Sequence, residues 1–341
     1  MKAVAIREHL SLDAPEVFHD LELPTPEATG RDLLVRVEAV SVNPVDTKVR
    51  GPKDRALDEP RVLGWDAAGV VEAVGDDVSL FEVGDEVYYA GVITRPGCDS
   101  ELHLVDERIV GHKPKSLSFE EAAAMPLTTL TAWEALFDRL GLPQYGPTDA
   151  PDETLLIIGG AGGVGSIATQ IAKEVAGVRV IATASRDESE AWCREMGADL
   201  VIDHTKPFAD EFGRVGVEHA DYVFCCNSTG EHFQNMVDVI KPQGRICTIV
   251  ETKEPLPISK LQSKSAAFLW ELMFTRPMFG TPDVVRQHEI LDEAARLFDA
   301  GTLRTTHTQS FGPLRAETLR DAHAQIETGR TIGKVTLGGI E

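Results

Sequence analysis

A short glycine-rich segment, from Gly160 to Gly165, is the part of the sequence whose residue types and spacing point most directly to chemistry. It follows the apolar run Leu155–Ile158 and precedes a stretch that we expect to be helical, from Ser166 to Ala176. Glycines let such a turn bend sharply and approach a pyrophosphate, and the helix that follows offers free N–H groups and a partial positive charge. The alternative is an ordinary strand-to-helix turn. The segment predicts a dinucleotide site at Gly160, Gly162, Gly163, Val164 and Gly165.

The residues after the next strand bear on which dinucleotide would be bound. Sites for NAD usually place an acidic side chain about 20 residues beyond the glycines, where it accepts hydrogen bonds from the ribose hydroxyls. Here Ala184 stands at the expected position, and Ser185 and Arg186 follow it. A hydroxyl and a guanidinium can bind a 2′-phosphate. The sequence therefore predicts NADPH, with a merely solvated Arg186 as the alternative.

The elements around these residues would have to position them. Short apolar runs at 178–182, 200–202, 222–224 and 245–250 alternate with stretches expected to be helical. Such alternation is typical of a doubly wound parallel sheet, which is the Rossmann architecture.

The rest of the chain has a different residue pattern. The first 125 or so residues are β-rich, with short strands broken by Gly, Pro and Asp turns. The tail contains a helix near 287–300 and ends in a strand at 334–337. We therefore predict an α/β protein with two domains. Residues 127–272 form the dinucleotide-binding Rossmann domain, and residues 1–126 with 273–341 form a β-rich catalytic domain.

Composition excludes several classes of protein. The 341 residues carry a net charge of −22, which disfavours nucleic acid and anionic membranes as partners because both need a cationic surface. No apolar run approaches the roughly 20 residues that span a bilayer, and the N-terminus lacks the apolar stretch of a signal peptide. Five cysteines form no Cys-x-x-Cys pair, which is typical of buried thiols. We expect a cytoplasmic protein with a small-molecule substrate.

The acidic surface has two interpretations. It is typical of a merely soluble acidic protein, and equally of a protein adapted to high salt, where dense carboxylates retain water. Stability and activity measured from low to molar KCl distinguish them, because only the second predicts a gain with salt.

Three further segments carry a resemblance to a known family. The segments Ser41–Lys48 and Met125–Ala132 resemble the quinone oxidoreductase and enone reductase branch of the medium-chain dehydrogenase/reductase superfamily. The segment Leu269–Arg276 resembles a bacterial subset termed zinc-type alcohol dehydrogenase-like. The resemblance covers essentially the whole chain. It implies that the β-rich domain is GroES-like, and that a homodimer forms through an edge strand near Ala266–Met273.

Zinc members of that superfamily hold a catalytic metal with Cys, His and Cys. The matching positions here are Asn43, Trp65 and, approximately, Leu127, and none is a normal zinc ligand. The four-cysteine structural zinc lobe is also missing, because only Cys98 lies in that region. Cys98 and His103 alone are two donors, which rarely hold zinc. The sequence therefore predicts no metal.

Without zinc, the oxidation of simple alcohols loses its Lewis acid. Delivery of hydride from NADPH to an enone or a quinone remains feasible, because hydrogen-bond donors can stabilise the anion that forms. The resemblance places the loop of Asn43, Asp46 and Lys48 near the nicotinamide, with Asn43 as amide donor and Lys48 as cation and proton donor. The alternatives are a loop-capping Asn43 and a surface Lys48 paired to Asp46. Trp65 would roof the substrate pocket or simply pack in the core.

The resemblance implies further cofactor contacts. Thr131 would lie by the nicotinamide ribose, or pack in a helix, and Asn227 would lie near the nicotinamide ring. The backbone of Ile249 and Val250 would hold the carboxamide, and Lys334 would approach the pyrophosphate.

Three functions follow from these residues. The first is an NADPH-dependent reductase of enones or quinones. The second is an NADP(H)-binding protein with little turnover, acting in a structural or redox-sensing role. A zinc-type alcohol dehydrogenase is disfavoured by the missing ligands.

Overall fold

A computed structural model describes residues 1–54, 56–146 and 153–340. The chain divides into two compact units. The central unit comprises residues 131–273, and the terminal unit comprises residues 1–130 together with 274–341. No helix of the described residues is long and apolar enough to cross a membrane.

The central unit is built on one six-stranded sheet whose paired strands are all parallel. Along the sheet the order is β11-β10-β9-β12-β13-β14, so the chain starts in the middle and winds outward in both directions. This is the doubly wound order, and its direction reverses between β9 and β12. The strands are β9 (Thr154–Ile158), β10 (Arg179–Thr183), β11 (Leu200–Ile202), β12 (Ala220–Cys225), β13 (Ile240–Thr248) and β14 (Ala267–Trp270).

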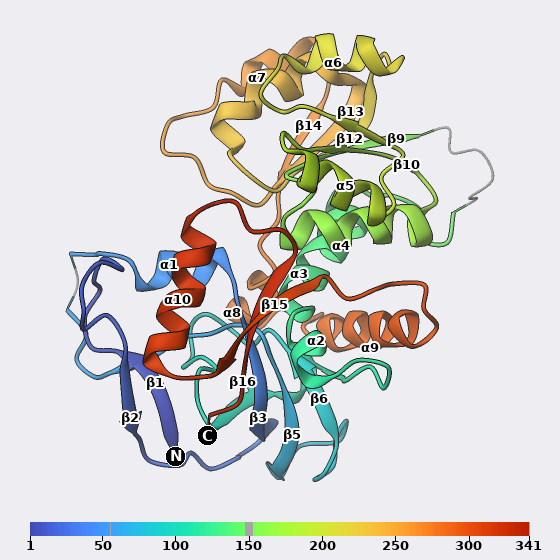
Figure 1. The fold of residues 1–341 in the computed structure, drawn as a ribbon. Coiled ribbons are helices and arrows are strands. Elements are labelled where there is room, and N and C mark those ends of the chain that lie inside the picture. Colours follow the sequence, from blue (N-terminus) through green and yellow to red (C-terminus); the bar gives the residue numbers. More distant parts are fainter. Residues whose placement is uncertain (55, 147–152, 341) are drawn as a thin grey trace. The chain divides into compact units, whose positions relative to one another are not determined.

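Helices cover both faces of this sheet. In Figure 1, α4 and α5 lie on one side, and α6 and α7 on the other. The helical elements of this part of the chain are α3 (Pro126–Trp133), which crosses the unit boundary, the π-helical turns η2 (Glu134–Arg139) and η3 (Ala172–Ala176), α4 (Gly163–Ile171), α5 (Asp187–Glu195), α6 (Phe208–Val215), α7 (Thr229–Val239) and the 3₁₀ helix η4 (Ile258–Lys264).

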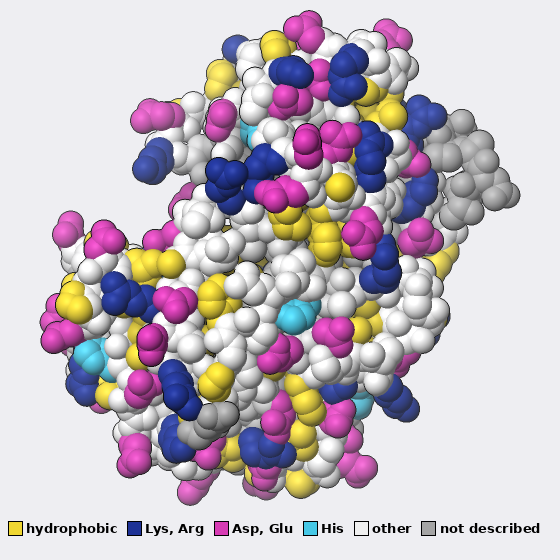
Figure 2. All heavy atoms as spheres, viewed as in Figure 1, with side chains coloured by type: hydrophobic (Ala, Val, Ile, Leu, Met, Phe, Trp, Pro, Cys, Tyr) yellow, Lys and Arg dark blue, Asp and Glu magenta, His cyan; other side chains and the backbone are white. Residues whose placement is uncertain are grey.

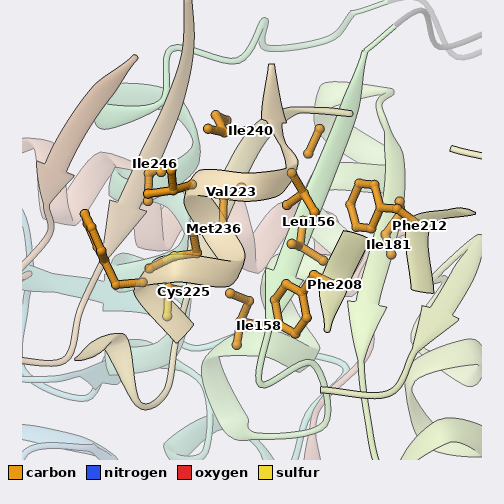
Figure 3. Close-up of a cluster of buried hydrophobic side chains, with 14 of the residues drawn as sticks. Leu156, Ile158, Ile181, Phe208, Phe212, Val223, Cys225, Met236, Ile240 and Ile246 are labelled. Carbon is orange, nitrogen blue, oxygen red and sulfur yellow. The ribbon is translucent and has the colours of Figure 1, made fainter. Parts of the chain in front are cut away.

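The core beneath α6 and α7 is apolar. Figure 3 shows Phe208 and Phe212 from α6 and Met236 from α7 packed on side chains of the sheet. The sheet contributes Leu156 and Ile158 to this cluster. Burial of each such side chain stabilises the folded state by about 1.5–3 kcal/mol. This packing therefore holds the carboxyl ends of the strands in place.

The terminal unit is β-rich and mostly antiparallel. Its seven-stranded sheet runs β15-β16-β3-β5-β6-β8, with β7 also paired to β3, and β2-β1-β4 form a small second sheet. The large sheet joins the two ends of the chain, because β16 pairs with β3. The strands are β1 (Lys2–Ile6), β2 (His19–Glu22), β3 (Asp32–Val42), β4 (Arg61–Val62), β5 (Ala67–Val74), β6 (Glu86–Tyr89), β7 (Leu102–Asp106), β8 (Val110–His112), β15 (His307–Pro313) and β16 (Lys334–Gly338).

Short helices connect these strands. Ser118 begins α2 with a capping box, because its hydroxyl accepts from the N–H of Glu121 and the Glu121 carboxylate accepts in return from the N–H of Ser118. The helices are α1 (Pro44–Arg50), the 3₁₀ turn η1 (Glu107–Ile109), α2 (Phe119–Ala123), α8 (Thr275–Phe279), α9 (Arg286–Asp299) and α10 (Ala316–Glu327).

The predicted fold class is confirmed: a parallel Rossmann-type sheet and a β-rich part. Two predicted elements need correction. The strand predicted at 245–250 ends at Thr248, and the helix predicted over 166–176 changes to a π-helical turn part-way. Acidic and basic side chains are interspersed over the face seen in Figure 2.

Candidate dinucleotide site and polar cluster

The glycine turn lies at the carboxyl end of β9, beside the point where the strand order reverses. A Cβ on Gly165 would lie 2.2 Å from the carbonyl oxygen of Gly159, which real atoms cannot tolerate. A Cβ on Gly160 would lie 2.7 Å from that of Ala182 and 2.9 Å from the Sγ of Cys193. The turn is therefore closed tightly onto the sheet and α5, and it presents the first turn of α4 with its unpaired N–H groups.

Residues after β12 and β13 share this edge of the sheet. Asn227 follows β12 and is exposed, and its Cβ lies within 3.4 Å of where a Cβ of Gly159 would be. Ile249 and Val250 follow β13 and are half-buried. Parallel pairing therefore brings these three predicted contacts to the edge that carries the glycine turn.

The end of β10 also meets the turn. The hydroxyl of Thr183 accepts a hydrogen bond from the N–H of Gly159 at 3.0 Å. Ser185 is exposed beyond it. Arg186 is half-buried at the start of α5, and its guanidinium forms an ion pair with Glu188. The guanidinium thus lies beside the predicted cofactor edge with an acidic partner.

Asp66 is the centre of a buried polar cluster in the terminal unit. Its Oδ1 accepts the N–H of Leu127 at 2.8 Å, and its Oδ2 accepts from Nδ2 of Asn43 at 2.8 Å and from Nζ of Lys334 at 3.0 Å. Lys334 also donates to Oδ1 of Asn43 at 2.6 Å and to the carbonyl of Val42 at 3.2 Å. The resemblance predicts Lys334 beside a pyrophosphate, whereas its ammonium here is shared among three oxygens of the terminal unit.

The predicted loop of Asn43, Asp46 and Lys48 forms the start of α1. Asn43 and Asp46 are each 1% exposed, and the carboxylate of Asp46 accepts from the N–H of Asn43. Lys48 is exposed, and within the described parts of the chain its side chain has no ion pair, with Asp46 or any other carboxylate. Its ammonium therefore differs from that of Lys334, which donates hydrogen bonds to three oxygens.

Three carboxyls are buried in this region, and the positive charge of Lys334 acts to lower the pKa of two of them, Asp46 and Asp66. Burial raises the pKa of Asp46 well above its usual value, and the charge of Asp99 raises it further. Burial also raises the pKa of Asp66, against the opposing effect of Lys334, and it raises the pKa of Asp99 to about 7. Oδ1 of Asp46 and Oδ2 of Asp99 have no partner in the structure as described. Burial therefore disfavours the charged form of each of these carboxyls.

Two other predicted residues are buried. Trp65 is 1% exposed, its indole N–H donates to the carbonyl of Val92 at 3.2 Å, and its ring meets Phe274 edge-on. This environment is that of a core side chain, the second of its two interpretations. Thr131 is also buried, at 5% exposure, where α3 crosses into the central unit.

Comparison with known proteins identifies the family. Residues 29–132 match the family described as alcohol dehydrogenase GroES-like domain, and residues 196–337 match zinc-binding dehydrogenase. The chain is 42% identical over 338 residues to a zinc-type alcohol dehydrogenase-like protein of Staphylococcus epidermidis, with 99% of both chains covered. The chain belongs to the medium-chain dehydrogenase/reductase superfamily. Within it, the chain belongs to the zinc-type alcohol dehydrogenase-like subset.

Other relatives span the same fold. A 2-methylene-furan-3-one reductase of Solanum lycopersicum is 31% identical over 100% of this chain and 79% of its own length. A quinone oxidoreductase of Pseudomonas aeruginosa is 32% identical over 95% and 96% of the two chains. A solved structure of a Rhizobium etli protein, described provisionally as a zinc-dependent alcohol dehydrogenase, superposes with a TM-score of 0.95. It is 49% identical, and the match covers 100% of this chain and 98% of that one. The chain is therefore an oxidoreductase of this superfamily.

Zinc-binding members of the superfamily hold a catalytic zinc, and the donor set of this dehydrogenase/reductase does not fit one. At the positions that match zinc ligands, the amide of Asn43 is held by the Lys334 ammonium, and Leu127 has no donor side chain. An ammonium 2.6 Å from the amide oxygen would repel a second cation. Among the described residues no group of three or more His, Cys, Asp or Glu side chains is arranged to hold a metal.

Cys98 and His103 have other partners. The thiol of Cys98 donates to the carbonyl of Asp66 at 3.5 Å. The ring nitrogens of His103 meet Tyr89 and the carbonyl of Pro96, and burial lowers the pKa of His103 to about 4.

Sequence reasoning missed Asp66, Asp99 and Cys193. Asp66 could have been found, because it ends the Gly64-Trp65-Asp66 segment that matches the Gly-His-Glu motif of zinc members. Asp99 and Cys193 carry no local signal, since their positions depend on contacts distant in the sequence.

Proposed function

We propose that this oxidoreductase uses NADPH to reduce an α,β-unsaturated carbonyl or a quinone, without zinc. The observation that carries the proposal is the glycine turn at the reversal of strand order, which closes tightly because a Cβ at Gly165 or Gly160 would collide with the turn, the sheet or α5. When bound there, NADPH would supply the hydride. The backbone of α4 would face the pyrophosphate, and Asn227, Ile249 and Val250 would lie along the nicotinamide side.

Ser185 and Arg186 support the choice of NADPH. Both follow β10, where an enzyme for NAD usually has an acidic residue. Arg186 already pairs with the carboxylate of Glu188, so a 2′-phosphate would compete with that carboxylate for the guanidinium.

The acceptor chemistry rests on the terminal unit. Reduction of an enone or a quinone builds negative charge on an oxygen, which hydrogen-bond donors and cations stabilise. Asn43 offers an amide donor there. The exposed ammonium of Lys48, which has no ion pair among the described residues, can stabilise the developing charge and donate a proton. Relatives named for a furanone and for quinones support this acceptor class. The resemblance favours enones, because several enone reductases have a lysine at the position of Lys48, where many quinone oxidoreductases have a tyrosine.

Steady-state oxidation of NADPH with a panel of enones and quinones tests the proposal. Turnover that needs the conjugated double bond supports it. Binding of NADPH without turnover supports instead a structural or redox-sensing protein. Lys48→Ala should lower kcat/KM on the enone at least tenfold, whereas the exposed Lys115→Ala should not. Stoichiometric zinc by elemental analysis, with loss of activity on chelation, would refute the zinc-independent assignment.

We also propose a cytoplasmic homodimer that forms through the free edge of β14. Trp270 is 49% exposed and Leu272 is 51% exposed, which is unusual for such large apolar side chains. Leu272→Glu should give monomers in sedimentation, whereas Val83→Glu, at an apolar residue of the terminal unit that is still more exposed, should leave the mass unchanged.

A further inference from the structure

The hydrogen bonds around Asn43 fix which way its amide points. Oδ1 receives the ammonium of Lys334 at 2.6 Å, and Nδ2 donates to the carboxylate of Asp66 at 2.8 Å. A flipped amide would place its NH₂ against the ammonium and its oxygen against the carboxylate, so both contacts would become repulsive. The opposite charges of Asp66 and Lys334 therefore hold one orientation.

One of the two Nδ2 hydrogens of Asn43 has only a long, weak hydrogen bond. The second Nδ2 hydrogen has only the carbonyl of Ser41, at 3.4 Å, which is beyond the usual length of an N–H···O bond. Charged partners on both ends also polarise the amide, because hydrogen bonds in a chain strengthen one another. The amide is thus pre-aligned and keeps one hydrogen for a stronger acceptor.

We infer that Asp66 and Lys334 are positioning residues that hold Asn43 so that its second Nδ2 hydrogen can be donated to the oxygen of the acceptor. The inference rests on the proposed reduction of an activated carbonyl or quinone. Asp66 and Lys334 do not touch the acceptor themselves. Asp66 also accepts a hydrogen bond from the backbone N–H of Leu127. Its carboxylate therefore binds both Asn43 and Leu127, which stand at two of the positions where zinc relatives place metal ligands.

This assignment differs from a purely structural one. Asp66 and Lys334 are 0% and 3% exposed, and a structural ion pair would affect stability whether or not Asn43 is present. A positioning pair affects kcat only through Asn43. The two roles therefore separate in a double-mutant cycle on kcat.

The cycle uses Asn43→Ala, Asp66→Asn and their combination, measured with saturating NADPH and an enone that the wild type reduces. Asn43→Ala should lower kcat about 100-fold, as loss of one oxyanion donor does. Asp66→Asn should lower kcat at least tenfold in the wild type, but less than twofold when Asn43 is already alanine. The affinity for NADPH, from cofactor fluorescence, should stay within twofold. Equal losses in both backgrounds, or an unchanged kcat in Asn43→Ala, would overturn the inference.

Lys334 is tested by conservative rescue. Lys334→Arg should retain at least a third of kcat, because a guanidinium still donates to Oδ1 of Asn43, whereas Lys334→Met should lose at least tenfold. If Lys334→Met does not fold, the double variant Asp66→Asn with Lys334→Met is measured in its place, because it removes both buried charges. Equal kcat for the Arg and Met variants contradicts the assignment.

A second readout needs no turnover. In protein labelled with ¹⁵N-asparagine, the Asn43 side-chain signals are those that Asn43→Ala removes. The Nδ2 proton that is donated to Asp66 should exchange with solvent more slowly than the other, and Asp66→Asn should remove this difference. Two equally slow protons would contradict the inference even if the wild type reduces no acceptor. If the exchange pattern is as expected but no acceptor is reduced, the proposed function is wrong, whereas the positioning of Asn43 by Asp66 still holds.

Discussion

The ammonium of Lys334 lies 3.0 Å from a carboxylate oxygen of Asp66, although 268 positions separate the two residues in the sequence. Their side chains are 4% and 0% exposed, so neither charge is compensated by bulk water. Loss of one partner from such a pair leaves an uncompensated charge, which is far more costly than loss of both.

Lys334→Met should therefore lower the free energy of unfolding of the terminal unit by about 3–5 kcal/mol. The double variant Asp66→Asn with Lys334→Met should recover a large part of this loss, and Lys115→Met, on the surface, should be neutral. Urea unfolding followed by tryptophan fluorescence measures the three differences. A double variant no more stable than Lys334→Met would contradict the role of the charge pair.

Gly165→Ala should disrupt the glycine turn, because its methyl group would lie 2.2 Å from the carbonyl oxygen of Gly159. We expect NADPH to bind at least tenfold more weakly and the melting temperature to fall. Gly213→Ala is the matched control: Gly213 lies within α6, no atom comes within 4 Å of its added Cβ, and the change should stabilise by up to about 1 kcal/mol. Equal NADPH affinity in both variants would argue against a cofactor on this turn.

Arg186→Ala should shift cofactor preference toward NADH. Loss of a charge-assisted hydrogen bond of about 1.5–3 kcal/mol corresponds to a 10- to 150-fold fall in kcat/KM for NADPH, with little change for NADH. Arg194→Ala, in the same helix and paired to Glu190, serves as control. An unchanged ratio of the two cofactors' kcat/KM would remove Arg186 from the 2′-phosphate site.

Glu271 predicts a pH dependence of stability. Its carboxyl is buried beside that of Glu134 and lies 2.7 Å from the guanidinium of Arg139. Burial and the charge of Glu134 raise the pKa of Glu271 to about 8. The folded state thus binds this proton more tightly than the unfolded state, whose carboxyl titrates near pH 4.5. The stability contributed by the proton is complete below pH 4.5 and is lost as the pH rises to about 8, at up to about 1.4 kcal/mol per pH unit.

Glu271→Gln should remove this slope, because a neutral amide has no proton to lose. The measurement is the difference in unfolding free energy between variant and wild type across pH 5–9, in which the titrations of other groups cancel. A difference that is flat over this range would show that Glu271 titrates normally in the folded protein.

The parts of the fold that depend on local pattern were predictable. The strand β9, its glycine turn and α4 follow directly from an apolar run, closely spaced glycines and a helix-forming stretch. In contrast, β15 (His307–Pro313) was not predicted, because polar residues, a glycine and a proline obscure its alternation. Its strand conformation depends on pairing with β16.

The candidate site was predictable to a similar degree. Residues placed by one strand end, such as Asn227 and Gly165, lie where the pattern puts them. The partners of Asn43 were not predictable, because Asp66 and Lys334 reach it from separate strands. Resemblance assigned Lys334 to a cofactor, whereas three nearby oxygens bind its ammonium within the terminal unit.

The pairing of β16 with β3 has a consequence for biosynthesis. The central unit is one continuous stretch, so all of its strands have been synthesised before Phe274 is added. The terminal unit must wait, with the carboxylate of Asp66 lacking its ammonium, until residues 334–338 have been made. A nascent chain released before residue 334 would carry a complete central unit and an unfinished terminal one.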